Sequence, residues 1–320
     1  MSTAQHAHTQ ARAAAAAAGV TIRELTEPKD HDAAAGLIAG LWSVEPGQSP
    51  MPSGLLRVMA YEGCYAAGVF DDEDGGRLIG AAAGFLASDG DAGGNHLHSH
   101  IAGVLPEANG RHAGFALKLH QRAWALSRGI GRITWTFDPL MRGNAYFNMA
   151  KLGAQASGYL VDFYGEKLHD GVNAGQGSDR LLMNWVLDAP RVVAAANGQR
   201  VAEPELEPLL GAGRAVLAET DVAPDTAAET TAISTTASTT SGASSVGASS
   251  VTATSVTATS IQDSPGPLLC ATPAAIQTLR HEAPELARAW RFAVRRALTE
   301  ALADGYHITG FTRSGWYLLD

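Results

Sequence analysis

The stretch that decides the fold is Gly103-Val-Leu-Pro-Glu-Ala-Asn-Gly-Arg-His-Ala-Gly-Phe-Ala-Leu117. A strand pattern over 96–105 runs into it, and a helix pattern over 111–128 follows. The free backbone N–H groups and the dipole at the start of such a helix favour an anion, and Gly110 and Gly114 let the backbone approach a phosphate. The stretch therefore predicts a phosphate-binding loop. It has neither the Gly-Lys-Ser/Thr of a Walker loop nor the Gly-x-Gly-x-x-Gly of dinucleotide folds.

The sequence around this loop predicts short strands and helices in alternation. Besides the helix after the loop, helices are expected from Asp30 onward and over 144–152, where Gly153 ends the second. The other expected strands lie over 20–25, 64–70, 77–86, 132–137, 159–164 and 181–187. An acidic, glycine-containing turn joins 64–70 to 77–86, so these two strands should form a hairpin before the loop.

Composition limits the classes of function. The chain has 320 residues, 46% hydrophobic and 17% charged, and 23 basic against 32 acidic residues give a net charge of −9. This charge argues against a general nucleic-acid binder, which needs a basic face. No apolar stretch reaches the roughly 20 residues that cross a membrane. Two cysteines cannot form a disulfide framework and fit a reducing compartment, so we expect a cytoplasmic protein.

Low-complexity sequence divides the chain. We expect a disordered tail over 1–19, a domain over 20–198, a disordered Ser/Thr/Ala linker over 219–264, and a small C-terminal helix–hairpin segment over 267–320 that docks on the domain. The linker repeats a pentad, as in Gly242-Ala-Ser-Ser-Val246, and its period matches neither a helix nor a strand. A modified Ser/Thr stalk is the alternative interpretation of this segment.

The loop residues Arg111-His-Ala-Gly114-Phe-Ala116 resemble the pyrophosphate loop of the GNAT superfamily of N-acetyltransferases, Arg/Gln-x-x-Gly-x-Gly/Ala. The order of elements is also similar, with a hairpin before the loop and a helix, a strand and a helix after it. Further stretches resemble a GNAT-like branch of bacterial proteins: Leu97-His-Ser-His100, Thr134-Trp-Thr-Phe-Asp-Pro139, Phe163-Tyr-Gly165, Asp170-Gly-Val-Asn173, Trp290-Arg291 and Gly305-Tyr306. The resemblance implies an α/β fold with a mixed, mostly antiparallel sheet, splayed parallel central strands flanked by helices, and a small C-terminal α+β segment.

The same resemblance implies acetyl-coenzyme A as co-substrate and no metal. The cleft would lie between the strands at 96–105 and 132–137, with the Val104 backbone pairing with the pantetheine arm. The backbone amides that would hold the pyrophosphate are those of Arg111, His112, Ala113, Gly114, Phe115 and Ala116. A backbone N–H on the splayed strand would polarise the thioester carbonyl, and an acceptor amine would attack it directly.

The sequence departs from the family in the helix that ends at Gly153. Many relatives place an asparagine early and a tyrosine late in this helix, and the tyrosine protonates the leaving thiolate. Here those positions hold Arg142 and Met149, and a methionine has no proton to give. Tyr146, one turn earlier, and Tyr164, on a following strand, are the candidates that remain.

Three histidines alternate on the strand before the loop, so His96, His98 and His100 should share one face. One interpretation is a general base for an ammonium acceptor, and His98 and His100 are preferred because they lie nearer the loop. A zinc site is the second interpretation, although no fourth ligand is evident. Structural or exposed histidines are the third.

A polar segment over 165–180 should lie beside the cleft. Its side chains Asp170, Asn173, Ser178, Asp179 and Arg180 are candidates for binding the acceptor, and solvated turn chemistry explains them equally well.

The sequence as a whole predicts an enzyme, an acyl-coenzyme A dependent N-acetyltransferase of GNAT type that acts on a small-molecule acceptor, an amine. The partners expected are that acceptor alone, without nucleic acid or membrane, and a homodimer is left open. A GNAT-like module that binds acyl-coenzyme A without transferring the acyl group is one alternative. A metal-dependent hydrolase that uses His96, His98 and His100 is the other.

Overall fold

The computed structural model describes residues 2–44, 49–90, 94–165, 177–200, 203–218, 222 and 266–320. Its larger sheet has seven strands in the order β1-β2-β3-β4-β5-β7-β6. Their bounds are β1 Val20–Glu24, β2 Tyr65–Asp71, β3 Arg77–Ser88, β4 Asn95–Val104, β5 Arg132–Phe137, β6 Gln155–Leu160 and β7 Arg180–Val186. Neighbouring strands are antiparallel except β4 and β5, which are parallel. The predicted mixed, mostly antiparallel sheet is confirmed.

The two parallel strands separate soon after they meet. They pair only at Leu97 with Ile133 and at His98 with Thr134, and beyond this rung the β4 edge that faces β5 has no strand partner. On its other side β4 carries a bulge, because β3 pairs Ala83 with Ile101 and Phe85 with His98. Two residues of β4 therefore oppose one residue of β3. Such a bulge bends a strand and increases its twist, which explains why β4 leaves β5 at this point.

Gly84 is the β3 residue opposite the bulge. A Cβ added to it would lie 2.6 Å from the His98 carbonyl oxygen and 3.1 Å from Ser99 Cα. No side chain fits at that distance, so the glycine permits the close approach of the two backbones.

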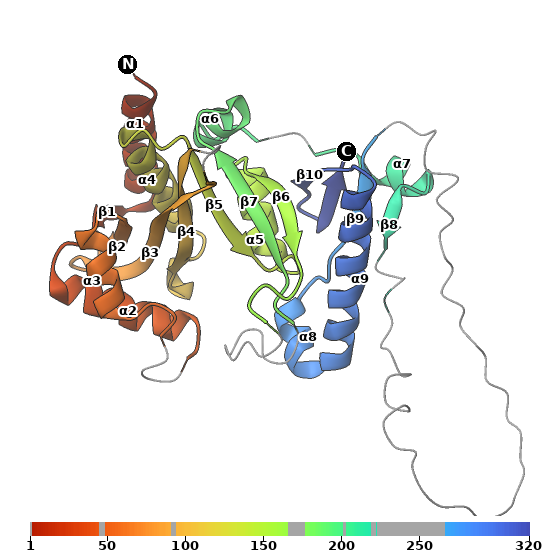
Figure 1. The fold of residues 1–320 in the computed structure, drawn as a ribbon, viewed down its shortest axis with the longest axis horizontal. Helices are drawn as coiled ribbons and strands as arrows, with labels where there is room; N and C mark the ends of the chain where they lie inside the picture. The colour runs from red at the N-terminus through yellow and green to blue at the C-terminus, as the bar shows by residue number, and fades with distance from the viewer. Residues whose placement is uncertain are drawn as a thin grey trace, which may run out of the picture.

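Helices cover both faces of this sheet (Figure 1). α1 (Thr3–Ala18) and α4 (Ala113–Ser127) lie on one face, and α2 (Pro28–Leu41) and α3 (Ser53–Tyr61) on the other. Side chains along each strand point alternately to the two faces of the sheet, so each face has its own core. Ala67 and Ala82 pack in the core with α4, whereas Ala66 and Ala83 pack with α2 and α3. After β5, α5 (Arg142–Tyr146) continues into a π-helical turn, η2 (Phe147–Lys151), and α6 (Pro190–Ala196) follows β7.

The prediction of a disordered tail over 1–19 is wrong, because residues 3–18 form α1. Ser2 and Gln5 form a capping box at its start, and Gly19 ends it with φ 63°. The alanine run carried no strong hydrophobic signal, but its small side chains let the helix approach α4 closely. Ala7 and Ala11 are buried there against Leu119 and Ala123.

A smaller sheet follows, in the order β10-β11-β9-β8. Its strands are β8 Ala215–Leu217, β9 Leu268–Ala271, β10 Ile308–Phe311 and β11 Trp316–Leu319, and its helices are α7 Leu206–Gly211, α8 Ile276–Glu282 and α9 Pro284–Ala303. β8 pairs with β9 in parallel. The C-terminal unit therefore takes a strand from before the expected linker, whereas the prediction began it at 267. The expected linker itself lies, apart from Val222, outside the described residues.

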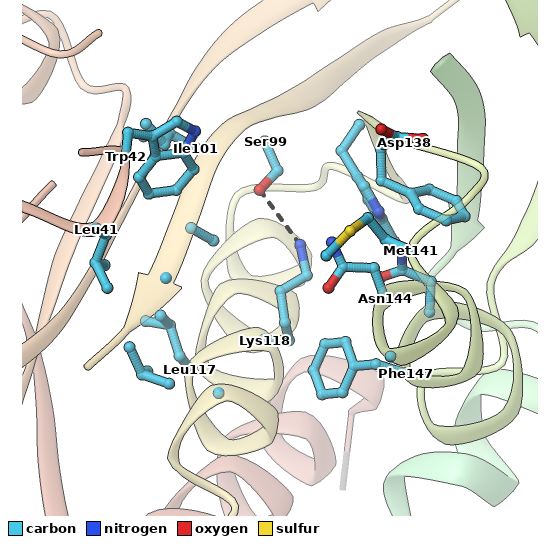
Figure 2. Close-up of a pocket in the computed structure, with 18 of the residues that line it drawn as sticks. Leu41, Trp42, Ser99, Ile101, Leu117, Lys118, Asp138, Met141, Asn144 and Phe147 are labelled. Atoms are coloured by element: carbon cyan, nitrogen blue, oxygen red, sulfur yellow. Dashed lines mark hydrogen bonds between the residues drawn. The ribbon is translucent and has the colours of Figure 1, made fainter. Parts of the chain in front are cut away.

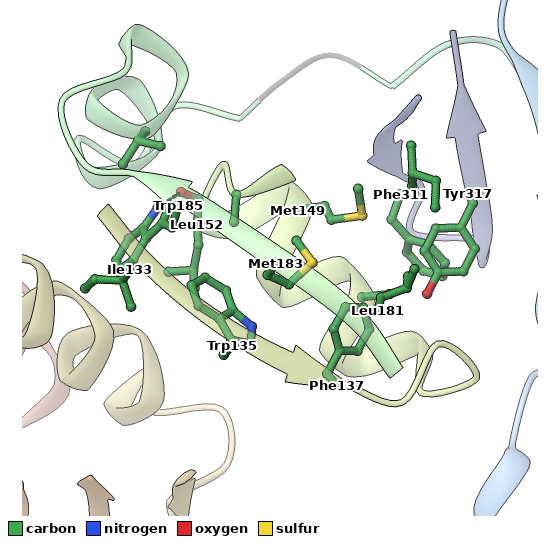
Figure 3. Close-up of a cluster of buried hydrophobic side chains, with 14 of the residues drawn as sticks. Ile133, Trp135, Phe137, Met149, Leu152, Leu181, Met183, Trp185, Phe311 and Tyr317 are labelled. Atoms are coloured by element: carbon green, nitrogen blue, oxygen red, sulfur yellow. Dashed lines mark hydrogen bonds between the residues drawn. The ribbon is translucent and has the colours of Figure 1, made fainter. Parts of the chain in front are cut away.

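The smaller sheet lies beside the β6–β7 end of the larger one (Figure 1). Phe311 and Tyr317 join the buried cluster that contains Met149 and Leu181 (Figure 3), and the Tyr317 hydroxyl donates a hydrogen bond to the Pro139 carbonyl at 2.7 Å. The two sheets thus share one hydrophobic core. Within the described ranges, no helix combines the length and apolarity that crossing a bilayer requires.

Candidate functional site

A cavity of about 1050 Å³ opens where β4 and β5 separate. β4 beyond its bulge and the end of β5 form two of its walls, and the start of α4, the end of α2 and the α5–η2 segment complete it. Figure 2 shows this arrangement, with Trp42 and Ile101 on the β4 side and Met141, Asn144 and Phe147 on the α5 side. Because the β4 edge inside the cavity has no strand partner, its backbone groups are available to a ligand that lies in an extended conformation.

The start of α4 lies at the wall of this cavity. The Ala116 N–H donates to the His112 carbonyl and begins the helical ladder. Within the described part of the chain, no acceptor bonds the preceding N–H groups of Ala113, Gly114 and Phe115. His112 and Gly110 have φ of 64° and 87°, which turns the chain sharply into the helix. Three free N–H groups and the positive end of the helix dipole make this an anion site.

Neither the backbone conformation nor the packing of the protein requires a glycine at position 114. Its φ is not positive, and a Cβ at this position would meet no atom within 4 Å. Because Gly114 lines the cavity, the space that its missing side chain leaves belongs to the cavity. The residue type therefore fits a site where a phosphate approaches the backbone.

The Arg111 side chain points to β1 and β2. Its guanidinium donates to both carboxylate oxygens of Asp71, at 2.6 and 3.0 Å, and to the Gly19 carbonyl at 3.1 Å. This arginine thus anchors the loop to the sheet. Its backbone N–H donates to the Ala108 carbonyl at 3.3 Å, so it is not free for a phosphate as predicted. Val104 lies at the end of β4 and lines the cavity, as the predicted pairing with a pantetheine arm requires.

The mixed, mostly antiparallel sheet, the splayed β4–β5 pair and the loop at the start of α4 are those that the resemblance predicts. The first part of the chain has the GNAT fold. No protein-family model matches this chain, and neither does any curated protein.

Solved GNAT structures align with about half of the chain. An acetyltransferase of the GNAT family from Streptococcus pneumoniae is 14% identical, with 52% of this chain and 97% of that one covered and a TM-score of 0.39. yncA from Salmonella typhimurium, solved with its cofactor acetyl-CoA, is 16% identical, with 53% and 95% covered and a TM-score of 0.43. The ribosomal-protein-S5-alanine acetyltransferase from Vibrio fischeri is 15% identical, with 53% and 94% covered and a TM-score of 0.41. The fold assignment rests on the strand order and the splay.

The three histidines of β4 have different surroundings. The Phe85 ring contacts both His98 and His100, with centroids 5.2 and 5.8 Å apart, so these two histidines share a face. His98 Nδ1 lies 3.1 Å from Thr134 Oγ1, and His96 Nδ1 lies 3.0 Å from an Arg132 nitrogen. Of these three histidines, His100 alone lines the cavity.

Burial makes all three histidines less basic. It lowers the pKa of His96 and His100, and burial beside the other two histidines lowers the pKa of His98 to about 4. All three rings are therefore neutral near pH 7. No group of three or more His, Cys, Asp or Glu side chains within the described residues is arranged to hold a metal ion.

The two candidate tyrosines lie in different places. Tyr164 is exposed, lines the cavity and has the Arg180 guanidinium over its ring at 5.1 Å. Tyr146 packs against the core below the Arg313 guanidinium and does not line the cavity. Met149 is buried in the core, as a side chain without a proton to give.

The polar segment contributes less to the cavity than predicted. Ser178 accepts a hydrogen bond from the Tyr164 backbone, and buried Asp179 accepts from Tyr159 and Arg295, so both stabilise the segment itself. Arg180 lines the cavity. Asp170 and Asn173 lie outside the described residues.

Two charged side chains of the cavity add to the predicted site residues. Asp138, directly after β5, lines the cavity and accepts from Arg291 at 2.7 Å and from Arg280 at 2.5 Å. Burial would raise the pKa of this carboxyl, but the two arginines outweigh it and hold the pKa well below its usual range. Asp138 is therefore a fixed anion that joins α8 and α9 to the cavity and cannot act as a base.

Lys118 is the second. Its ammonium lies 3.3 Å from Ser99 Oγ, 2.6 Å from Gln121 Oε1 and 4.1 Å from the centre of the Trp135 ring. Burial lowers the pKa of this amine to about 7. The sequence contains little sign of this role. Lys118 lies outside the apolar stripe of the helix, so helical periodicity predicts an exposed side chain.

Proposed function

We propose that the protein transfers an acetyl group from acetyl-coenzyme A to a small-molecule amine. The observation that carries this proposal is the cavity between the splayed strands, which combines an anion site with an open strand edge. The free N–H groups of Ala113, Gly114 and Phe115 suit a pyrophosphate, and the edge of β4 suits the two amides of a pantetheine arm. A ligand with both groups in this order fills both features at once.

The chain's own residues supply positioning and proton acceptance. A backbone N–H of the β4 edge, beyond the last paired rung at His98, polarises the thioester carbonyl. His100 lines the same cavity with a neutral imidazole, so it accepts the proton that an ammonium acceptor must lose before attack. Arg180 and Tyr164 also line the cavity, and we expect them to contact an anionic or aromatic part of the acceptor away from its amine.

Calorimetry with acetyl-coenzyme A tests the binding part of the proposal, and a screen of amines that reads free thiol release tests the transfer. We expect saturable binding at one site and thiol release with at least one class of amine. Thiol release without an acceptor, at the rate seen with every amine, would contradict transfer. Binding without any release would instead support the non-catalytic binding module.

A further inference from the structure

A buried lysine stands at the apex of the cavity. The last rung that β4 and β5 share joins His98 to Thr134, and Ser99 and Trp135 are the next residues on the two strands. Lys118 reaches both from α4, with its amine 3.3 Å from the Ser99 hydroxyl and 4.1 Å from the centre of the Trp135 ring. The amine therefore lies at the point where the strands part, and Figure 2 shows it pointing into the pocket.

The side chains around this amine accept two of its three N–H donors. An ammonium has three N–H donors. Ser99 and Gln121 accept two of them, and Gln121 Nε2 also donates to Ser99 at 3.1 Å, which fixes the triangle. No other side-chain or backbone acceptor bonds the amine within the described part of the chain. The nitrogen also lies 4.1 and 5.5 Å from the centres of the Trp135 and Trp185 rings, so the third donor faces an aromatic ring or a ligand in the cavity.

The length of β4 places a thioester at this apex. The anion site lies at the end of β4, near Val104, and the strand from there back to Ser99 spans about 16 Å. An extended arm that starts at the anion site and follows the open edge therefore ends beside Ser99. Lys118, hydrogen-bonded to Ser99, is a titratable side chain at this end of the ligand, together with His100.

We propose that Lys118 donates the proton that the coenzyme A sulfur takes up as it leaves. This rests on the proposed acetyl transfer. When the tetrahedral intermediate collapses, the C–S bond breaks and its electron pair goes to sulfur. The Lys118 N–H gives its proton to that sulfur, and coenzyme A leaves as the thiol. The ammonium acceptor loses one proton before attack, and its nitrogen loses a second as the amide forms. Both go through His100 to solvent, and solvent restores the proton on Lys118, so one proton is released for each acetyl group transferred.

The alternatives are less well placed for this role. Met149 cannot donate a proton, and Tyr146 does not line the cavity. Burial lowers the pKa of the Lys118 amine to about 7, below the roughly 8.5 of an ordinary thiol, so the transfer to a thiolate runs downhill. The ring of Trp135 and the Ser99 hydroxyl stabilise the ammonium enough to keep it charged part of the time.

Titration of bound coenzyme A tests the proposal without any acceptor. The probe is coenzyme A itself, with the ultraviolet band of its thiolate followed against pH and desulfo-coenzyme A as baseline. An ammonium beside the sulfur favours the thiolate, so wild-type protein should hold about tenfold more thiolate than Lys118→Met near neutral pH. Lys118→Gln, which keeps a hydrogen bond to Ser99, repeats the measurement if the Met variant fails to fold.

Lys151→Met is the matched control, because Lys151 lines the opposite, η2 wall of the cavity. It should leave the thiolate fraction unchanged. Equal thiolate fractions in wild type and Lys118→Met would overturn the proposal, and so would a change confined to Tyr164→Phe. An acetyl group found on Lys118 by mass spectrometry would also overturn it, because the amine would then be an acceptor. Failure of every protein to bind coenzyme A would contradict the proposed function itself.

Discussion

Arg291 and Asp138 form a buried bidentate ion pair, 2.7 Å across in both contacts, between a helix of the C-terminal unit and the strand end that borders the cavity. Arg280 adds a third contact from α8. The C-terminal unit is therefore fastened to the wall of the candidate site and is more than a neighbour of it. This ion pair and the shared core hold the two parts together.

Asp138→Asn should lower the free energy of unfolding by about 3 kcal/mol or more, because it leaves two buried guanidinium groups without their anion. Urea unfolding measures this loss. Asp74→Asn is the control, since it removes an exposed contact with Arg77 and should cost under about 1 kcal/mol. The wild-type contribution belongs to the ionised carboxyl, so it is present above the ordinary pKa of an aspartate and is lost as pH falls below it.

Gly114→Glu should abolish acetyl-coenzyme A binding and leave the melting temperature nearly unchanged. The new side chain would bring a negative charge to the anion site, and its Cβ has open space within 4 Å. Gly36→Glu is the matched control, because Gly36 lies exposed on α2 with equally open space. Calorimetry decides the matter, and unchanged affinity in the Gly114 variant would place the phosphate elsewhere.

His100→Gln should lower turnover roughly 10²-fold with an amine acceptor from the screen, the usual size of a general-base contribution. His98→Gln should lower it less, because His98 bonds Thr134 outside the cavity lining. Burial lowers the pKa of His100 below the usual 6.5 of an imidazole. The pH at which turnover falls on the acid side should therefore also lie below 6.5. Equal effects of the two variants would assign both histidines a structural role.

Lys118 should make the protein more stable as pH rises from about 7 to about 10.5. Over this window the unfolded chain holds a proton on the lysine that the folded chain has released, so stability rises with pH. The full effect has an upper limit of roughly 5 kcal/mol. Lys118→Met should flatten the rise in urea unfolding experiments at several pH values. An unchanged slope would mean that the buried amine keeps its ordinary pKa.

Deletion of residues 226–260 should leave the melting temperature and coenzyme A binding nearly unchanged. β8 and β9 flank the expected linker and pair directly, so about fifteen remaining residues still join them. Shortening a flexible connection from about 50 to about 15 residues changes its closure entropy by only about 1 kcal/mol. Differential scanning calorimetry of the two chains is the measurement, and a fall of many degrees would show that the composition misled the linker prediction.

The sequence by itself determined the elements whose signals are local. The loop at Gly114, the helix after it and the hairpin before it follow from glycine positions and apolar periodicity, because each depends on neighbours within a few residues. The resemblance of the loop from Arg111 to Ala116 then implied the mixed, mostly antiparallel sheet with splayed parallel central strands. The sequence did not predict the alanine helix α1, because small side chains give a weak periodic signal and the burial of this helix depends on α4.

Only the tertiary structure decided the chemistry of the cavity. Ser99, Lys118 and Trp135 come from three elements and meet because β4 bulges and leaves β5 at one rung. The strand pattern placed His98 and His100 on one face, but the same splay decides that His100 alone reaches the cavity. The pKa of Lys118 and of Asp138 likewise depends on burial and on partners distant in sequence, such as Arg291, which no local pattern records.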